Sequence, residues 1–74
     1  MRLDMETQQV LVFKTTVSSV HEVEGLIHLL NKFGKWSFDL EDEDRILRIE
    51  TFSSPQEIEG GLSMLGFGCS LMPY

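Results

Sequence analysis

The sequence is short of cysteine, of basic residues and of long apolar runs. Its single cysteine, Cys69, excludes an intrachain disulfide and gives no sign of an oxidising compartment. Six Lys and Arg against twelve Asp and Glu give a formal net charge of −6, which disfavours a nucleic-acid partner because phosphates must be neutralised. No run approaches the roughly 20 apolar residues of a membrane span, and the polar N-terminus lacks the apolar stretch of a signal peptide. We therefore expect a cytoplasmic protein with no membrane partner.

The length of 74 residues predicts one small domain with a thin core. A domain of this size buries only about 60% of the surface that its unfolded chain exposes, which leaves little room for an internal active site. The 42% of hydrophobic and 24% of charged residues are typical of a globular protein and argue against wholesale disorder. We expect residues 1–8 to be a flexible lead-in and residues 9–74 to be a single domain.

The first predicted element is a strand over residues 9–16. It is apolar on both faces, with Leu11 and Phe13 pointing one way and Val10 and Val12 the other. A strand with two apolar faces is typical of the inside of a sheet, so we expect it to be central.

A helix is predicted to follow over residues 20–33. Ser19 stands three residues before Glu22, the capping-box spacing in which each side chain satisfies a backbone N–H at the helix start. Apolar residues then recur at helical spacing, and Gly34 is the expected C-terminal cap.

The second half of the chain repeats this logic. Two runs alternate between apolar and polar residues, which is typical of half-exposed strands. Trp36, Phe38 and Leu40 lie on one side of the first run, and Leu47 and Ile49 point inward in the second. Ser54 as cap, Pro55 at the first helical position and Glu57 three residues after the cap predict a second helix. The elements expected here are strands over 35–41, 45–52 and 67–74 and a helix over 54–66.

The element order β-α-β-β-α-β predicts an α+β, ferredoxin-like sandwich, with a four-stranded antiparallel sheet and two helices on one face. If the first and third strands are central, Val10, Val12 and Ile46 lie together on the face away from the helices. An exposed apolar patch of this kind can mark an interaction site. We therefore expect a protein partner or a homodimer through the open sheet face.

Three stretches of the chain carry a resemblance to a known family. Val20 is followed by Val23-Glu24 at the start of the first predicted helix, a strand is expected over 36–40, and Gly66-Phe67 stands before the last strand. These stretches resemble the first helix start, the second strand and the glycine-aromatic turn of the heavy-metal-associated domain, the ferredoxin-like module of copper chaperones and metal-pumping ATPases. The resemblance covers residues 10–72.

That family carries a Met-x-Cys-x-x-Cys loop before the first helix, and the resemblance places Thr16 and Ser19 at the two cysteine positions and Lys14 at the methionine. Hydroxyl groups are poor ligands for Cu(I), which prefers thiolates, so no metal is expected at these degenerate positions. One interpretation of Lys14, Thr16, Ser18, Ser19 and Phe67 is a loop site for an anion or polar ligand. The alternative, which we favour, is that the hydroxyls only cap the helix.

Other candidate sites are weaker. Cys69 could bind a soft metal with Met72, but positions three apart in a strand point to opposite faces. His21 and His28 lie about 10 Å apart along a helix, too far to share an ion. The acidic turn at 39–45 lacks the glycine and the terminal glutamate of a calcium-binding EF-hand loop.

We find no catalytic constellation and expect neither an enzyme nor a cofactor. The favoured hypothesis is a non-catalytic binding or protein-interaction module with a heavy-metal-associated-like fold that has lost its thiolate site. One alternative is an atypical heavy-metal carrier or chaperone that uses Cys69 or a dimeric site. Another is a small-ligand regulatory domain, which rests on fold analogy alone.

Overall fold

The computed structural model describes residues 8–72. Of the predicted lead-in over residues 1–8, only Gln8 is among them, and residues 73–74 of the predicted last strand also lie outside the described part. The elements are β1 (Gln9–Thr15), α1 (Val20–Glu24), α2 (Ile27–Phe33), β2 (Gly34–Asp39), β3 (Ile46–Thr51), α3 (Pro55–Met64) and β4 (Cys69–Leu71). Within residues 8–72, no helix combines the length and the apolar character needed to cross a membrane.

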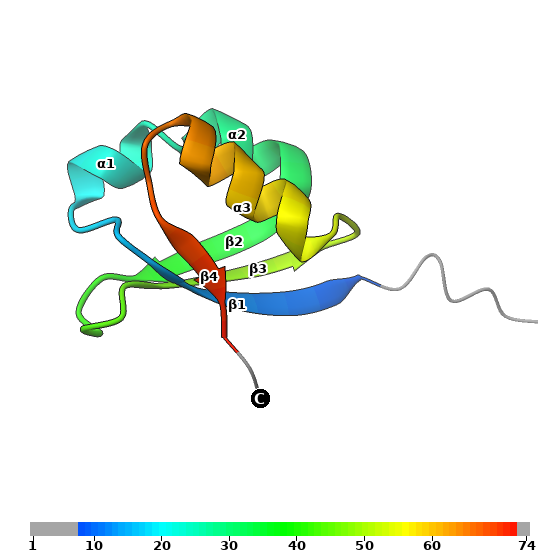
Figure 1. The fold of residues 1–74 in the computed structure, drawn as a ribbon, viewed down its shortest axis with the longest axis horizontal. Coiled ribbons are helices and arrows are strands. Elements are labelled where there is room, and N and C mark those ends of the chain that lie inside the picture. Colours follow the sequence, from blue (N-terminus) through cyan, green and yellow to red (C-terminus); the bar gives the residue numbers. More distant parts are fainter. Residues whose placement is uncertain (1–7, 73–74) are drawn as a thin grey trace, which may run out of the picture.

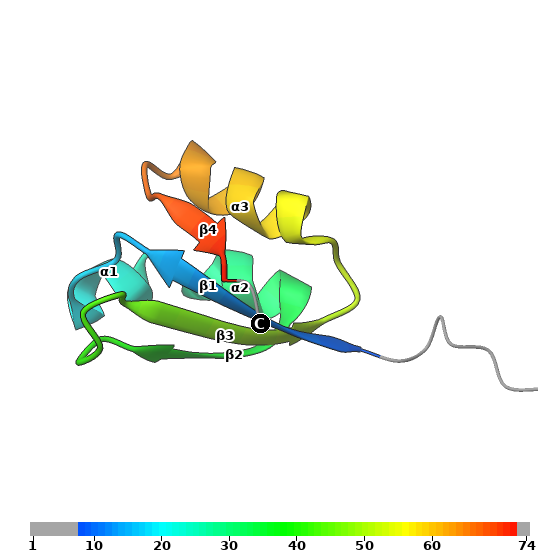
Figure 2. The same cartoon turned by 60° about the horizontal axis from the view of Figure 1, so that its bottom comes forward.

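The strands form one antiparallel sheet in the order β2-β3-β1-β4, and Figure 2 shows the four strands side by side in this order. Phe13 of β1 lies opposite Leu47 of β3 on one side and Leu71 of β4 on the other. The predicted central position of the first strand is confirmed, and the α+β class with a four-stranded antiparallel sheet is confirmed with it.

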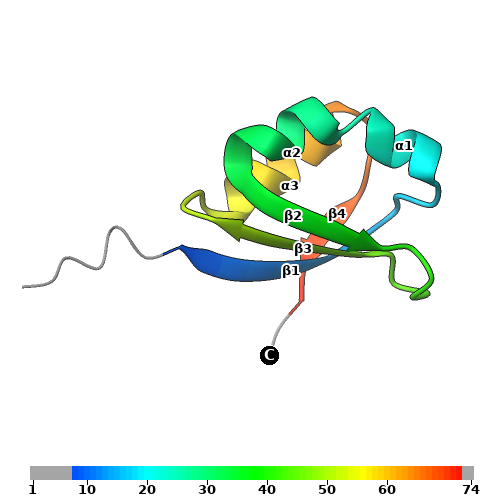
Figure 3. The same cartoon turned by 180° about the vertical axis from the view of Figure 1, so that it is seen from behind.

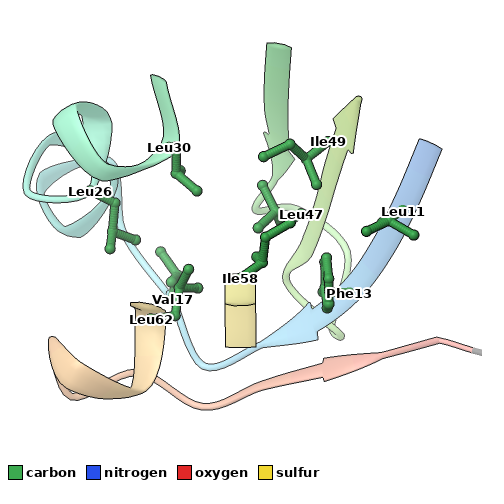
Figure 4. Close-up of a cluster of buried hydrophobic side chains, with 9 residues drawn as sticks. All are labelled: Leu11, Phe13, Val17, Leu26, Leu30, Leu47, Ile49, Ile58 and Leu62. Carbon is green, nitrogen blue, oxygen red and sulfur yellow. The ribbon is translucent and has the colours of Figure 1, made fainter. Parts of the chain in front are cut away.

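The helical segments lie on the same side of the sheet (Figures 1 and 3). Side chains from this layer and from the facing side of the sheet form one buried cluster (Figure 4). The strand residues of this cluster are those that the alternation predicts to point inward. Its buried members are Leu11, Phe13, Val17, Leu26, Leu30, Leu47, Ile49, Ile58 and Leu62.

The single helix predicted over residues 20–33 is wrong, because the structure divides it into α1 and α2. At the break, the Gly25 N–H donates to the Glu22 carbonyl oxygen and the Leu26 N–H to the Val23 carbonyl oxygen, both bonds spanning three residues instead of four. Such tight turns end an α-helix, and glycine favours a break because it is a poor helix former. Val20, the first residue of α1, is 68% exposed, although the helical spacing that it shares with Val23, Ile27 and Leu30 predicts a buried position.

The Gly34 end of the first predicted helix and the start of the second are confirmed, but α3 ends at Met64 and not at the predicted residue 66. Ser54 and Glu57 form a complete capping box at the start of α3, with Pro55 in the first turn. Gly34 caps α2 with a φ of 150°, and its N–H donates to the Leu30 carbonyl oxygen. This glycine is also the first residue of β2, so one residue ends the helix and starts the strand.

Candidate functional site

The loop between β1 and α1 is anchored at its start by Thr15, a buried residue. The Thr15 hydroxyl donates to the Arg45 carbonyl oxygen at 2.6 Å and accepts from the Val17 N–H at 3.2 Å. The Thr15 N–H donates to the Asp44 carbonyl oxygen at 3.1 Å. The side chain of Val17 is fully buried in the core. These contacts hold the loop against both the β2–β3 turn and the core.

Thr16, at the first of the two cysteine-equivalent positions, is bonded to the turn before β4. Its hydroxyl accepts from the Gly68 N–H at 2.8 Å, and its own N–H donates to the Gly68 carbonyl oxygen at 3.1 Å. The neighbouring Phe67 packs against the core, and its N–H donates to the Leu62 carbonyl oxygen. Thr16 therefore joins two segments that lie 52 residues apart in the sequence.

Ser18 and Ser19 are both bonded to Glu22. The Ser19 hydroxyl accepts from the Glu22 N–H at 3.2 Å, as a helix N-cap does. The Glu22 carboxylate accepts from the Ser18 N–H at 2.7 Å and from the Ser18 hydroxyl at 3.0 Å. Only half of the capping box predicted for Ser19 and Glu22 forms, because this carboxylate bonds the residue before the cap.

The charge at the start of α1 is already negative. Hydrogen bonds from the Ser18 N–H and then from the Ser18 hydroxyl hold the pKa of the Glu22 carboxyl below its ordinary value. The carboxylate is therefore ionised near neutral pH, and it occupies the donors that an incoming anion would need. This geometry favours the structural interpretation of the loop over an anion site.

Lys14 points to the sheet face opposite Thr15, since successive side chains of a strand alternate. Its ammonium nitrogen lies 3.8 Å from Asp44 Oδ1, and both side chains are well exposed, so the pair is weak. The predicted loop residues thus fall into separate groups: Thr16 with Phe67 through Gly68, Ser18 with Ser19 through Glu22, and Lys14 on the open face of the sheet.

Cys69 starts β4 opposite Thr15 and packs against the core. Burial, with a smaller contribution from the charge of Glu59, raises the pKa of its thiol to about 12. The thiol is therefore protonated near pH 7, whereas soft metals bind the thiolate. Within residues 8–72, no three His, Cys, Asp or Glu side chains are grouped so that they could hold a metal ion.

The predicted interface residues differ sharply in exposure. Val10 is 57% exposed, whereas Val12 is 5% and Ile46 7% exposed. The cross-strand neighbour of Val12 is Arg48, and that of Ile46 is Lys14. The aliphatic stems of such long basic side chains can cover apolar neighbours. The three residues therefore do not form an exposed apolar patch, and only Val10 offers substantial surface.

Two surface hollows were not predicted from the sequence. The larger, of about 300 Å³, lies between α2 and α3, and its lining includes Leu29, Met64 and Leu65. Gly25 and Gly61 also line it. A Cβ on Gly61 would lie 3.2 Å from a Leu29 methyl carbon, so the small residue allows the helices to approach. The sequence signal for this close approach is a glycine inside a helical pattern. Such a glycine lowers helix stability by about 1 kcal/mol relative to alanine, so its presence suggests a packing role.

The smaller hollow, of about 140 Å³, lies over β2 and β3 on the helix-free face. Its charged lining residues are Lys35, Arg48 and Glu50, and the register places Lys35 opposite Glu50. Because both signs of charge meet here, the hollow does not select an anion or a cation.

No family model, no curated protein and no solved structure matches the chain.

Proposed function

We propose that the chain is a non-catalytic protein-interaction module on a ferredoxin-like scaffold similar to the heavy-metal-associated domain, with a loop after β1 that serves structure and not metal binding. The observation that carries this proposal is that the hydroxyls of Thr16, Ser18 and Ser19 are all engaged in hydrogen bonds within the chain. A ligand at this loop would have to replace those bonds, and each replaced bond costs about 1 kcal/mol.

The ferredoxin-like part of the proposal is supported by the strand order, in which β1 and β3 are central and both flanking strands are antiparallel to them. The division of the first helix into α1 and α2 is a local departure from the β-α-β-β-α-β order. It does not alter which strands are neighbours.

The metal-carrier alternative has less support, because Cys69 is the only cysteine in the sequence and its thiol is poorly suited to bind a metal. The raised pKa of Cys69 opposes formation of the thiolate at neutral pH. The raised pKa also supports a non-catalytic role for Cys69, since a nucleophilic cysteine needs a lowered pKa.

Metal titration of the purified chain tests the proposal. We expect no stoichiometric binding of Cu(I) or Zn(II), and a cooperative thermal transition that strong chelators do not change, since the core is formed by side chains alone. The control is Cys69→Ser. Binding of one ion per chain that is lost in Cys69→Ser would establish the carrier alternative instead.

The hollow between α2 and α3 favours a second candidate, a small-ligand regulatory domain. Its volume of about 300 Å³ equals the lower end of the range for ligand pockets, and its lining is mainly apolar. A small apolar probe that raises the Tm saturably in the parent but not in Gly61→Val would support this role. Equal behaviour of the two chains would remove it.

A further inference from the structure

The two edges of the sheet differ in how their backbone groups are satisfied. β4 has only 3 residues, and the N–H of Leu71 donates to Glu59 Oε2 of α3 at 3.1 Å. β2 has 6 residues and borders β3 on one side only. Within residues 8–72, the backbone of residues 35–39 makes no hydrogen bond beyond those to β3. A six-residue strand with an uncovered row of N–H and C=O groups is a template for another strand.

The exposed position of this edge is visible from the side shown in Figure 3, where β2 borders the sheet in front of β3. Trp36 and Phe38 of β2 point toward the helices and are only partly buried. Their rings make an edge-to-face contact, with the ring centroids 6.0 Å apart. Lys35, Ser37 and Asp39 point to the opposite face and are exposed. The strand therefore has one aromatic face and one polar face along its whole length.

The sequence of β2 is complementary to itself in one antiparallel register. In an antiparallel pair, residues directly opposite each other lie on the same face of the sheet. The two-fold axis of a symmetric pair must therefore pass midway between the two copies of one residue, which face each other. Centred on Ser37, Lys35 faces Asp39 of the second copy, and Trp36 faces Phe38 of the second copy. Centred on Trp36 instead, Lys35 would face a serine. Centred on Phe38, Asp39 would face a serine. Among the residues of β2, only the Ser37 register places opposite charges together, and it also matches Trp36 with Phe38 on both sides of the centre.

We propose that a second copy of this chain pairs with the β2 edge, antiparallel and centred on Ser37, so that two four-stranded sheets form one continuous sheet. The inference rests on the proposed interaction role and names the partner. Asp39 suits this geometry because its Oδ1 accepts from the N–H groups of Glu41 and Asp42, which leaves Oδ2 to accept from Lys35 of the second copy.

The dimer is weak, because one strand pair buries less surface than a stable interface needs. Sedimentation equilibrium of the full chain tests it, with a concentration-dependent dimer expected below about 1 mM. Lys35→Glu places two acidic side chains opposite each other at both ends of the pair and weakens dimerisation about tenfold. The matched control is Lys14→Glu, which makes the same charge change on the same face but on central β1, and leaves the dimer unchanged.

The exchange Lys35→Glu with Asp39→Lys restores opposite charges and recovers dimerisation. A strictly monomeric parent, or an equal effect of Lys35→Glu and Lys14→Glu, would overturn the inference.

Cross-linking gives a readout that does not depend on the turn held by Asp39. In a Cys69→Ser background, Ser37→Cys faces its own copy with Cα atoms about 4.5–5.5 Å apart, within disulfide range. Mild oxidation then yields a covalent dimer quickly, and Ser70→Cys on the β4 edge yields little. Equal cross-linking at both positions would contradict pairing through β2. Neither result bears on metal binding, so failure of this dimer is distinguishable from failure of the proposed function.

Discussion

Replacement of Gly34 tests whether the junction between α2 and β2 is built as described. This residue has a φ of 150°, and a Cβ there would overlap the carbonyl oxygen of Glu50 and lie 3.1 Å from its carbonyl carbon. Glu50 belongs to β3, a central strand, so its backbone cannot move without disturbing pairs on both sides. We expect Gly34→Ala to lower the free energy of unfolding by at least about 3 kcal/mol, combining the strained φ with this overlap.

Two other glycines supply matched controls for the same substitution. Gly66 has a φ of 93° but open space around its missing Cβ, so Gly66→Ala carries only the backbone cost, about 1–2 kcal/mol. Gly60 lies inside α3, also with open space, and Gly60→Ala should stabilise the protein by about 0.5–1 kcal/mol.

Urea denaturation followed by circular dichroism measures all three variants on one scale. The predicted order of stability is Gly60→Ala above the parent, then Gly66→Ala, then Gly34→Ala. For a domain of this size, 3 kcal/mol corresponds to a fall in Tm of at least about 12 °C. A Gly34→Ala variant as stable as Gly66→Ala would show that the contact between Gly34 and β3 is not made.

Three further predictions concern the loop, the thiol and the core. Because the pKa of Glu22 is lowered in the folded state, its stabilising effect is present above its ordinary pKa of 4.5 and is lost as pH falls through the folded value. Glu22→Gln should therefore be less stable than the parent at pH 7, and the difference should shrink in urea titrations below pH 4.5. At pH 8 the Cys69 thiol, with its pKa of about 12, should react with a thiol reagent about a thousandfold more slowly in the folded than in the urea-unfolded chain; equal rates would contradict its burial. Leu62→Ala should cost about 2–5 kcal/mol because this side chain is fully buried, whereas Met64→Ala, at an 87% exposed residue, should change stability by less than about 0.5 kcal/mol.

The strands and the second helix were predictable because short-range signals coincide there. In α3, Ser54, Pro55 and Glu57 each favour a helix start at the same place, and the structure forms the complete capping box. Along β3, the alternation places Leu47 and Ile49 in the core, where both are fully buried. In both elements, one local pattern has one physical interpretation, and the structure agrees with it.

The first helix was predicted less well because two signals conflict there. The apolar spacing runs on from Val23 to Leu30, but Gly25 weakens the helix between them, and the periodicity carries no information on which effect prevails. In the structure, Leu26 and Leu30 are fully buried after the break, so tertiary packing decides the orientation of α2.

The candidate loop was only partly predictable, because its decisive contacts are long-range. The contact of Thr16 with Gly68 joins residues that are 52 positions apart in the sequence, and no local sequence pattern predicts it. The open sheet face was misjudged for a similar reason. Alternation correctly predicts that Val12 and Ile46 point away from the core. Their low exposure accompanies basic cross-strand neighbours, Arg48 and Lys14, and which residues become neighbours depends on the strand register.

The most direct test of the central claim, that this loop is a structural element without its metal ligands, is a Cu(I) competition titration. The parent and the double variant Thr16→Cys with Ser19→Cys are compared against a chelator of moderate affinity. We expect the parent to bind no Cu(I) and the double variant to bind about one ion per chain, since two thiols would then stand at the start of a helix, where thiolates are favoured. Stoichiometric Cu(I) binding by the parent, or a folded double variant with no gain in affinity, would contradict the account.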